Sequence, residues 1–256
     1  CVYAQGLTGD LFLNRHSKIL VNLHGLEMFQ PSFSRKEAFS KWLIRPRFKR
    51  QIHHAWKLVS LGGGLGELLF ANGAQAEQVV VLPNGVDDLW LESPKTTQTT
   101  DKPRFLMVGR NEFRKGFHVL VEALGMISEP IELHLVGEWP RIEPTHHIVR
   151  HHGLVRDKHK MIAIMDSCNV LLLPSLSEGM PTVVLEAKAR GLHVIATDVG
   201  AMSVLQKDLL PPGDAQVLAV AMRQCGKSTE RPQLPSQYKW EEIARNTLLE
   251  LESKCD

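Results

Sequence analysis

The chain has 256 residues, of which 43% are hydrophobic and 23% charged, and its formal net charge is +2. This composition excludes a disordered or fibrous chain and is typical of a globular protein with a buried core. A net charge so close to zero does not favour a nucleic-acid-binding protein, so we expect no nucleic-acid partner. No hydrophobic run approaches the roughly 18 residues that a membrane-spanning helix requires.

The four cysteines lie far apart in the chain, at Cys1, Cys168, Cys225 and Cys255. Without a C-x-x-C pair they argue against a disulfide framework or a zinc site and favour a reducing, cytoplasmic compartment. The adjacent histidine pairs lack the spacing of metal ligands on a helix, and no D-x-D sequence occurs. We therefore expect neither a bound metal nor a cofactor.

In the first part of the chain, residues 18–25, 57–63 and 78–87 predict buried strands, and no strand is recognisable before them. The polar, threonine-rich stretch 92–104 has no periodicity and predicts a linker. The absence of an initial methionine and of a first strand suggests a chain that begins in the middle of a domain.

From residue 104 onward, apolar strands and amphipathic helices alternate regularly. Strands are predicted over 104–110, 131–137, 146–153, 169–175 and 193–200, and helices over 115–127, 157–168, 182–191 and 238–252. Short Val/Ile/Leu strands separated by helices indicate a parallel sheet covered on both faces. We predict an α/β protein with domains at 1–94 and 95–235 and a closing helix at 236–256.

Ligands of such sheets bind at the loops that follow the carboxyl ends of the strands. One of these loops is "VGRNEFRKG", residues 108–116, in which Gly109 leaves room for a ligand near the backbone. Arg110 and Lys115 add a planar fork of N–H groups and a point charge, a pairing suited to a diphosphate. The alternative is a solvated basic loop before a helix.

A second such loop is "PSLSEGMPTVVLEAKARG", residues 174–191, with Glu178 before a helix and Glu186 inside it. A helix beginning at residues 179–183 offers free N–H groups and the positive end of its dipole to an anion. A carboxylate that accepts from two adjacent hydroxyls suits a ribose or a hexose. The alternative is an ordinary helix-start acid followed by a surface glutamate.

Two weaker candidates are His24, at the end of a strand, and the backbone around Val155, placed to meet a nucleobase edge. A lone histidine is more often structural than functional. The segment 34–57 contains eight Lys/Arg and one acid, interleaved with Trp42 and Phe48. It predicts either docking on an anionic membrane surface or a solvated basic helix, which Pro46 would break.

The motifs "LPNGVD", "FLMVGRNEFRKGFHVLVEAL", "LHLVG", "HGLV" and "LLLPSLSEGMPTVVLEAKARGLHVIATDVGA" follow one another in this order. Together, over residues 18 to 250, they resemble the retaining, nucleotide-sugar-dependent glycosyltransferases of family 4. The resemblance implies the GT-B fold: two Rossmann-like, doubly wound parallel-sheet domains, the first incomplete here, with a closing C-terminal helix. It also implies metal-independent transfer of a sugar from a nucleoside-diphosphate sugar to a glycan, lipid or small acceptor.

The resemblance assigns roles to matched positions. Arg110 and Lys115 would bind the diphosphate, Glu178 the hydroxyls of the transferred sugar, and His24 would face that sugar from the first domain. Glu186 would bind the ribose. The remaining implied contacts of the sugar nucleotide are Gly109, Val155, Gly179, Met180, Pro181, Thr182 and Val183.

Several positions depart from the family pattern. His193 stands where the family usually has proline, and the segment 200–205 has Ala201, Ser203 and Val204 in place of glycine, proline and glutamate. An alternative is therefore a catalytically impaired homologue or fragment that still binds a nucleotide sugar. A nicotinamide-dependent oxidoreductase is disfavoured because "GGGLGE" lacks the last glycine of G-x-G-x-x-G.

Overall fold

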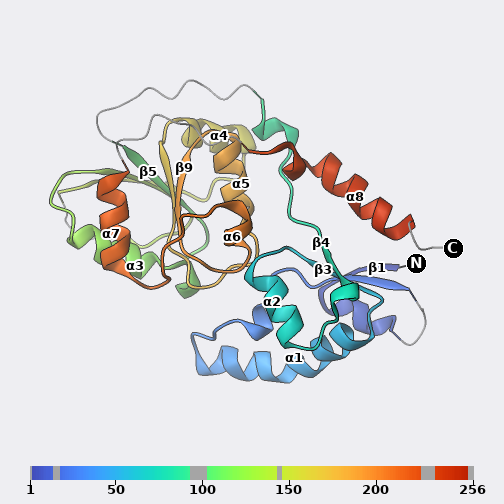
Figure 1. Ribbon diagram of the computed structural model, residues 1–256. Helices are drawn as coiled ribbons and strands as arrows, with labels where there is room; N and C mark the ends of the chain where they lie inside the picture. Colours follow the sequence, from blue (N-terminus) through green and yellow to red (C-terminus); the bar gives the residue numbers. More distant parts are fainter. Residues whose placement is uncertain (1, 14–17, 93–102, 143–145, 226–233, 253–256) are drawn as a thin grey trace.

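The computed structural model describes residues 2–13, 18–92, 103–142, 146–225 and 234–252, which form two parallel sheets (Figure 1). The first sheet has the order β1 (Val2–Gln5), β2 (Ile19–Asn22), β3 (Lys57–Ser60), β4 (Val79–Val81). The second has the order β7 (Ile148–Gly153), β6 (Glu132–Val136), β5 (Arg104–Val108), β8 (Val170–Leu173), β9 (His193–Ala196). Every strand pair is parallel, as the apolar strand pattern predicts.

The expectation that no strand precedes residue 18 is wrong. Strand β1 pairs in parallel with β2, with Tyr3 opposite Leu20. Of the residues of β1, only Ala4 is buried, because the strand lies at the edge of its sheet. A strand with one small buried side chain has no apolar run from which it could be predicted.

The order of the first sheet follows the chain without a reversal, as in one half of a doubly wound sheet. Its connections are η1 (Gly6–Leu11), η2 (Glu27–Phe29), α1 (Arg35–His54), α2 (Gly64–Ala71), η3 (Ala76–Gln78) and η4 (Asp88–Trp90). Phe48 and Ile52 of α1 and Leu65 of α2 join one buried cluster with Val21 and Leu58 of the sheet, so both helices cover the same face.

Helix α1 does not break at Pro46 and continues from Arg35 to His54. Pro46 removes one N–H and displaces the carbonyl four residues earlier, that of Trp42. Both residues are exposed, so the helix can continue without the cost of a buried, unpaired carbonyl. The helix is also fixed at its start, where the hydroxyl of Ser34 accepts from the N–H of Glu37 at 3.1 Å.

The second sheet reverses its strand order between β5 and β8, so its topological switch point lies between these two strands. Its helical segments are η5 (Phe113–Lys115), α3 (Phe117–Gly125), α4 (Lys158–Asp166), α5 (Thr182–Ala189), α6 (Met202–Leu205) and α7 (Ala215–Gln224), and the chain continues through η6 (Ser236–Tyr238) into α8 (Trp240–Glu252). Helices α3 and α7 pack on one face and α4 and α5 on the other (Figure 1).

The side chains of β5 and β8 alternate between these two faces. Phe105 and Leu172 pack in the cluster that includes α3 and α7, whereas Leu106 and Leu171 pack in the cluster that includes α4 and α5. Burial on both faces explains why these strands read as continuous apolar runs. Helix α7 was not anticipated from the sequence, although Asp214 caps it by accepting from the N–H of Val217 at 2.9 Å.

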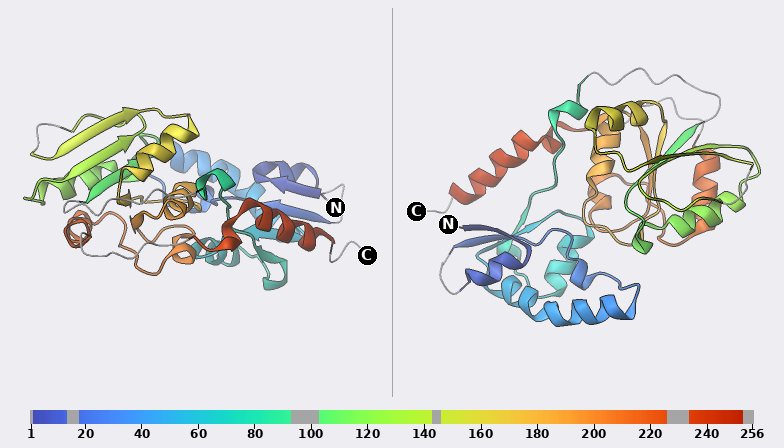
Figure 2. Two further views of the ribbon diagram at one scale, coloured as in Figure 1. Left: turned by 90° about the horizontal axis from the view of Figure 1, so that it is seen from above. Right: turned by 180° about the vertical axis from the view of Figure 1, so that it is seen from behind.

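The two sheets are joined by buried contacts. The cluster around Val21 and Leu58 of the first sheet continues to Leu171 and Val184 of the second. At the end of η6 the chain returns toward the first sheet, where the carbonyl of Tyr238 accepts from the N–H of Val86, a residue that follows β4, at 2.8 Å. Helix α8 then extends beside the first sheet (Figure 2).

Candidate functional site at the switch point

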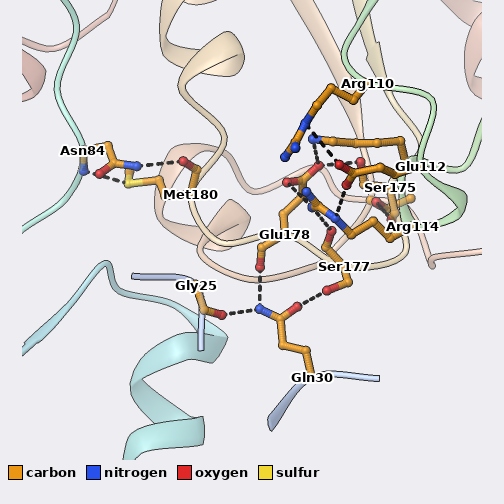
Figure 3. A network of polar contacts seen from close by, with 12 residues as sticks. Gly25, Gln30, Asn84, Arg110, Glu112, Arg114, Ser175, Ser177, Glu178 and Met180 are labelled. Atoms are coloured by element: carbon orange, nitrogen blue, oxygen red, sulfur yellow. Dashed lines mark hydrogen bonds and ion pairs between the residues drawn. The ribbon is translucent and has the colours of Figure 1, made fainter. Parts of the chain in front are cut away.

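The loops that follow β5 and β8 are fastened to each other at the switch point. The N–H of Leu176 donates to the carbonyl of Arg114 at 2.7 Å. Gly116, with φ of 70°, allows the backbones of the two loops to approach each other, because a Cβ atom there would lie 1.9 Å from the carbonyl oxygen of Pro174. The two sequence-predicted loops, 108–116 and 174–191, therefore form one site (Figure 3).

Glu178 lies at the centre of this site, and its side chain is only 6% exposed. Oε1 lies 2.7 Å from Nζ of Lys115 and accepts a 2.7 Å hydrogen bond from the hydroxyl of Ser175. Oε2 lies 3.3 Å from Nη1 of Arg114. Two cations and a hydroxyl thus compensate a buried carboxylate, which would otherwise be costly to bury.

Arg110 is placed differently from Lys115. Its side chain is 78% exposed, and its Nε lies 3.0 Å from Oε1 of Glu112. The other oxygen of Glu112 lies 2.7 Å from Nε of Arg114, so Glu112 joins the two arginines (Figure 3). The site therefore has three cations, of which Arg110 projects furthest into solvent.

Sequence reasoning missed Arg114, which contacts Glu178, while selecting Arg110, which does not. The signal was present, because Arg114 is a third cation in the same short loop. Residue types alone do not show which of three neighbouring cations points inward. The turn of η5 and its approach to β8 decide this.

The start of helix α5 presents unpaired backbone groups to the site. The helix begins at Thr182, after Pro181, as the predicted helix over 182–191 requires. Within the parts of the chain that the structure describes, the N–H groups of Gly179, Met180, Thr182 and Val183 have no backbone acceptor. Such N–H groups, with the positive end of the helix dipole, suit an anion.

Glu186 is half-buried one turn into α5. Burial, reinforced by the negative charge of Asp87, raises the pKa of Glu186 to about 7, against the opposing effects of Lys158 and a hydrogen bond with Thr182. Asp87 follows β4 and forms an ion pair with Lys158 at the start of α4. Glu178 and Glu186 therefore lie in separate environments, with no shared partner among the contacts described.

His24 and Val155 follow strands of different sheets, β2 and β7. His24 is exposed, has a φ of 52°, and its N–H donates to Oδ1 of Asn22 at 2.9 Å. It lines a pocket of about 420 Å³ between the first sheet and α8. Val155 is half-buried in the loop between β7 and α4, where it packs against the main cluster.

The loop that contains His24 meets the Glu178 loop through two glycines. A Cβ atom added to Gly25 would lie 3.0 Å from Cα of Gly179, so the two backbones touch. Two further contacts were not anticipated: Gln30 bonds to the Glu178 loop, and Nδ2 of Asn84 donates to the carbonyl of Met180 at 2.8 Å (Figure 3). The first sheet therefore contributes directly to the site.

Among the residues that the structure describes, no three His, Cys, Asp or Glu side chains gather as a metal site would require. Over the same residues, none of the helices has the length and apolar character needed to cross a bilayer.

Comparison with known proteins identifies relatives of this chain. Residues 102–227 match the family model for Glycosyl transferases group 1. The teichuronic acid biosynthesis glycosyltransferase TuaC of Bacillus subtilis is 31% identical over 220 residues, which is 79% of this chain and 54% of TuaC. The chain spans about half the length of the curated relatives it matches.

Solved structures show the same architecture. HepE of Anabaena, in complex with UDP, superposes with a TM-score of 0.75 at 20% identity, covering 96% of this chain and 76% of HepE. Sucrose-phosphate synthase of Thermosynechococcus elongatus gives a TM-score of 0.78 at 21% identity, covering 98% and 73%. The chain has the GT-B fold, and its relatives in sequence are glycosyltransferases.

Proposed function

We propose that this protein transfers a sugar from a nucleoside-diphosphate sugar to a hydroxyl of a glycan, lipid or small acceptor, with retention of configuration. The bond between the anomeric carbon and the phosphate oxygen breaks, and a new bond to the acceptor oxygen forms on the same face of the sugar. The acceptor loses its proton, and the nucleoside diphosphate departs. No metal has a part in this proposal.

The observation that supports the proposal most strongly is the cluster of Arg110, Arg114 and Lys115 at the switch point, beside the free N–H groups before α5. Negative charge develops on the diphosphate as the sugar leaves. Preorganised cations and N–H groups aimed at that charge are the largest catalytic contribution in reactions of this kind. Arg110, the most exposed of the three cations, pairs with Glu112 and projects furthest toward solvent, where a phosphate could reach it.

The two carboxylates suit the two polyhydroxyl parts of such a ligand. We assign Glu178 to the transferred sugar, with the N–H groups of Gly179 and Met180 nearby, and Glu186 to the ribose. The N–H groups of Thr182 and Val183 are assigned to phosphate, and the backbone near Gly109 and Val155 to the remaining nucleotide contacts. His24 is assigned to the face of the sugar that turns toward the first sheet.

The acceptor side of the proposal includes an anionic membrane surface as the docking partner of α1. The outward face of α1 exposes Phe39, Trp42 and Leu43 by 61%, 63% and 55%, and the two aromatic rings stack at 5.9 Å. Helical spacing places Arg35, Lys36 and Lys49 around these side chains, together with Arg47 and Arg50, which already pair with Asp10. Apolar side chains among cations fit anionic lipid headgroups.

Not every cation of this segment is available to lipid. Lys41 and Arg45 turn inward and donate to the carbonyls of Pro31 and Met28, each at 2.7 Å.

If α1 docks on an anionic membrane, the protein should sediment with phosphatidylserine-containing vesicles and not with pure phosphatidylcholine. Trp42→Ala should weaken sedimentation several-fold, whereas Phe70→Ala, which removes an exposed aromatic of α2, should not. Equal effects of the two variants would contradict the α1 assignment.

The sugar-nucleotide assignment is tested by calorimetric titration with UDP, GDP and ADP and with their glucose, mannose and N-acetylglucosamine conjugates. UDP is the first probe because the structurally similar HepE was solved with it. We expect one nucleotide to bind saturably, with affinity reduced by Arg110→Ala and unchanged by Arg223→Ala, an exposed arginine near the end of α7. Absence of binding by every nucleotide would overturn the proposal, and binding without transfer would limit it to recognition.

A further inference from the structure

Gln30 extends from the connection between β2 and α1 into the Glu178 loop of the second sheet. Its side chain amide is buried, and the residue is only 7% exposed. Nε2 donates to the carbonyl of Glu178 at 2.7 Å and also to the carbonyl of Gly25. Oε1 accepts from the hydroxyl of Ser177 (Figure 3). Both N–H groups and the oxygen of one carboxamide are therefore used to join the two loops.

Gln30 is itself fixed to α1. Gln30 directly follows the short helix η2, and its N–H donates to the carbonyl of Glu27 at 3.2 Å. The buried ammonium of Lys41 lies 3.3 Å from the carbonyl of Gln30 and 2.7 Å from that of Pro31. Glu37, 2.7 Å away, neutralises Lys41. The carboxamide is thus presented by a fixed backbone.

The neighbouring carbonyls of the Glu178 loop are also fixed. The carbonyl of Gly179 accepts from the N–H of Ala201 at 2.9 Å, and the carbonyl of Met180 accepts from Nδ2 of Asn84 at 2.8 Å. Together with the bond from Gln30 to the carbonyl of Glu178, these bonds engage three successive carbonyls of the loop. Two of these three hydrogen bonds come from residues of the first part of the chain.

A fixed carbonyl determines where the next N–H points. The carbonyl of one residue and the N–H of the next belong to the same planar, trans peptide group and point in opposite directions. The bond from Gln30 to the carbonyl of Glu178 therefore orients the N–H of Gly179. The bond from Ala201 likewise orients the N–H of Met180.

We propose that Gln30 is a positioning residue that holds the N–H of Gly179 and the carboxylate of Glu178 in place for the transferred sugar. This inference rests on the proposed function, because it uses the same sugar-nucleotide site. It adds that the first sheet sets the geometry of that site through one carboxamide. Gln30 itself does not touch the sugar nucleotide.

The test uses Gln30→Met, which keeps the volume and removes the hydrogen bonds. Gln78→Met is the matched control, because Nε2 of Gln78 also donates to two carbonyls, those of Ala55 at 2.8 Å and Ile52 at 3.4 Å. Both of those carbonyls lie in the first half of the chain, remote from Glu178 in sequence. The two variants therefore lose similar hydrogen bonds, but only Gln30→Met loses a bond to the second sheet.

The first measurement is hydrogen exchange of the unliganded protein over residues 174–184. We expect Gln30→Met to accelerate exchange in this segment at least about tenfold, as expected when one hydrogen bond of ordinary strength is lost. Gln78→Met should leave the segment unchanged. Equal exchange in the two variants would overturn the inference, and this result does not depend on any nucleotide binding.

The second measurement is the ratio of affinities for a nucleotide sugar and for the nucleotide alone. Gln30→Met should lower this ratio about tenfold, since only the sugar-bearing ligand uses Glu178 and Gly179. A merely structural role would weaken both ligands equally and would overturn the inference. If the unsubstituted protein bound no nucleotide, the proposed function would fail while the exchange result still decided the role of Gln30.

If Gln30→Met does not fold, a milder variant tests the same inference. Ser177→Ala removes the hydroxyl that donates to Oε1 of Gln30 and leaves both Nε2 bonds in place. It should accelerate exchange over 174–184 by a smaller factor than Gln30→Met. No acceleration in Ser177→Ala, when Gln30→Met cannot be purified folded, would count against the positioning role.

Discussion

Nζ of Lys115 lies 2.7 Å from Oε1 of Glu178, and the two residues follow different strands of the second sheet. The pair joins the loops that follow β5 and β8. Arg114 reaches the other carboxylate oxygen at 3.3 Å, so the charge of Glu178 is shared between two cations. A sugar nucleotide that binds here would place its phosphate beside cations that already have a partner.

Glu178→Gln should affect both stability and ligand discrimination. The substitution leaves the largely buried Lys115 without its carboxylate, while Arg114 keeps only Glu112, which should lower the free energy of unfolding by about 2–3 kcal/mol. Because Glu178 is assigned to the sugar, affinity for the nucleotide sugar should fall more than affinity for the nucleotide alone. Denaturant unfolding and calorimetry measure the two effects. Glu112→Gln, at a more exposed carboxylate of the same cluster, should cost less than about 1 kcal/mol.

Arg110→Ala and Arg114→Ala should differ in a predictable way. Arg110 is 78% exposed, so its loss should change the free energy of unfolding by less than about 0.5 kcal/mol. Its loss should still weaken nucleotide binding at least about tenfold, because a charge-assisted contact to phosphate disappears. Arg114→Ala should lower stability by about 1–2 kcal/mol, since it removes contacts to Glu112 and Glu178. The same stability loss in both variants would contradict the geometry.

Glu186 should make stability depend on pH around neutrality. Its pKa is raised from 4.5 to about 7, so the folded state favours the protonated form. The resulting stabilisation is complete below about pH 4.5 and is lost as the pH rises through 7. At pH 8, Glu186→Gln should be more stable than the unsubstituted protein by up to about 3 kcal/mol, a difference that vanishes near pH 4.

The measurement for Glu186 is denaturant unfolding of both proteins from pH 4 to pH 8. Glu122→Gln, on the exposed face of α3, is the control and should show no such trend. A constant difference between Glu186→Gln and the parent protein at every pH would refute the raised pKa. At pH 8 the same variant should bind nucleotide more weakly, because it loses a charged acceptor for ribose hydroxyls.

Arg190→Lys should destabilise the protein although the charge is retained. Arg190 is buried, binds Asp166 through two nitrogens at 2.8 and 2.7 Å, and donates to the carbonyls of Trp90 and Glu92. Lysine has no planar fork with which to make these contacts together. We expect a loss of about 3 kcal/mol in the free energy of unfolding. Arg156→Lys, at an exposed arginine, should change it by less than about 0.5 kcal/mol.

Strands with an apolar face on both sides were predictable, and the less buried elements were not. The runs at 104–110, 131–137 and 169–175 correspond to β5, β6 and β8 within a few residues. Edge strand β1 was not predicted because only one of its residues, Ala4, is buried. Helix α1 was expected to break at Pro46, but an exposed position tolerates the lost hydrogen bond.

The sequence by itself determined the parallel α/β class and the two loops that we propose as the ligand site, because apolar periodicity and the chemistry of Arg110, Lys115, Glu178 and Glu186 are local properties of the chain. Only the tertiary structure decided that Arg114 and Lys115 pair with Glu178 and that Gln30 bonds to the same loop. These contacts depend on where the loops turn and on how the two sheets pack. Such relationships join residues far apart in the chain, so no pattern of neighbouring residues encodes them visibly.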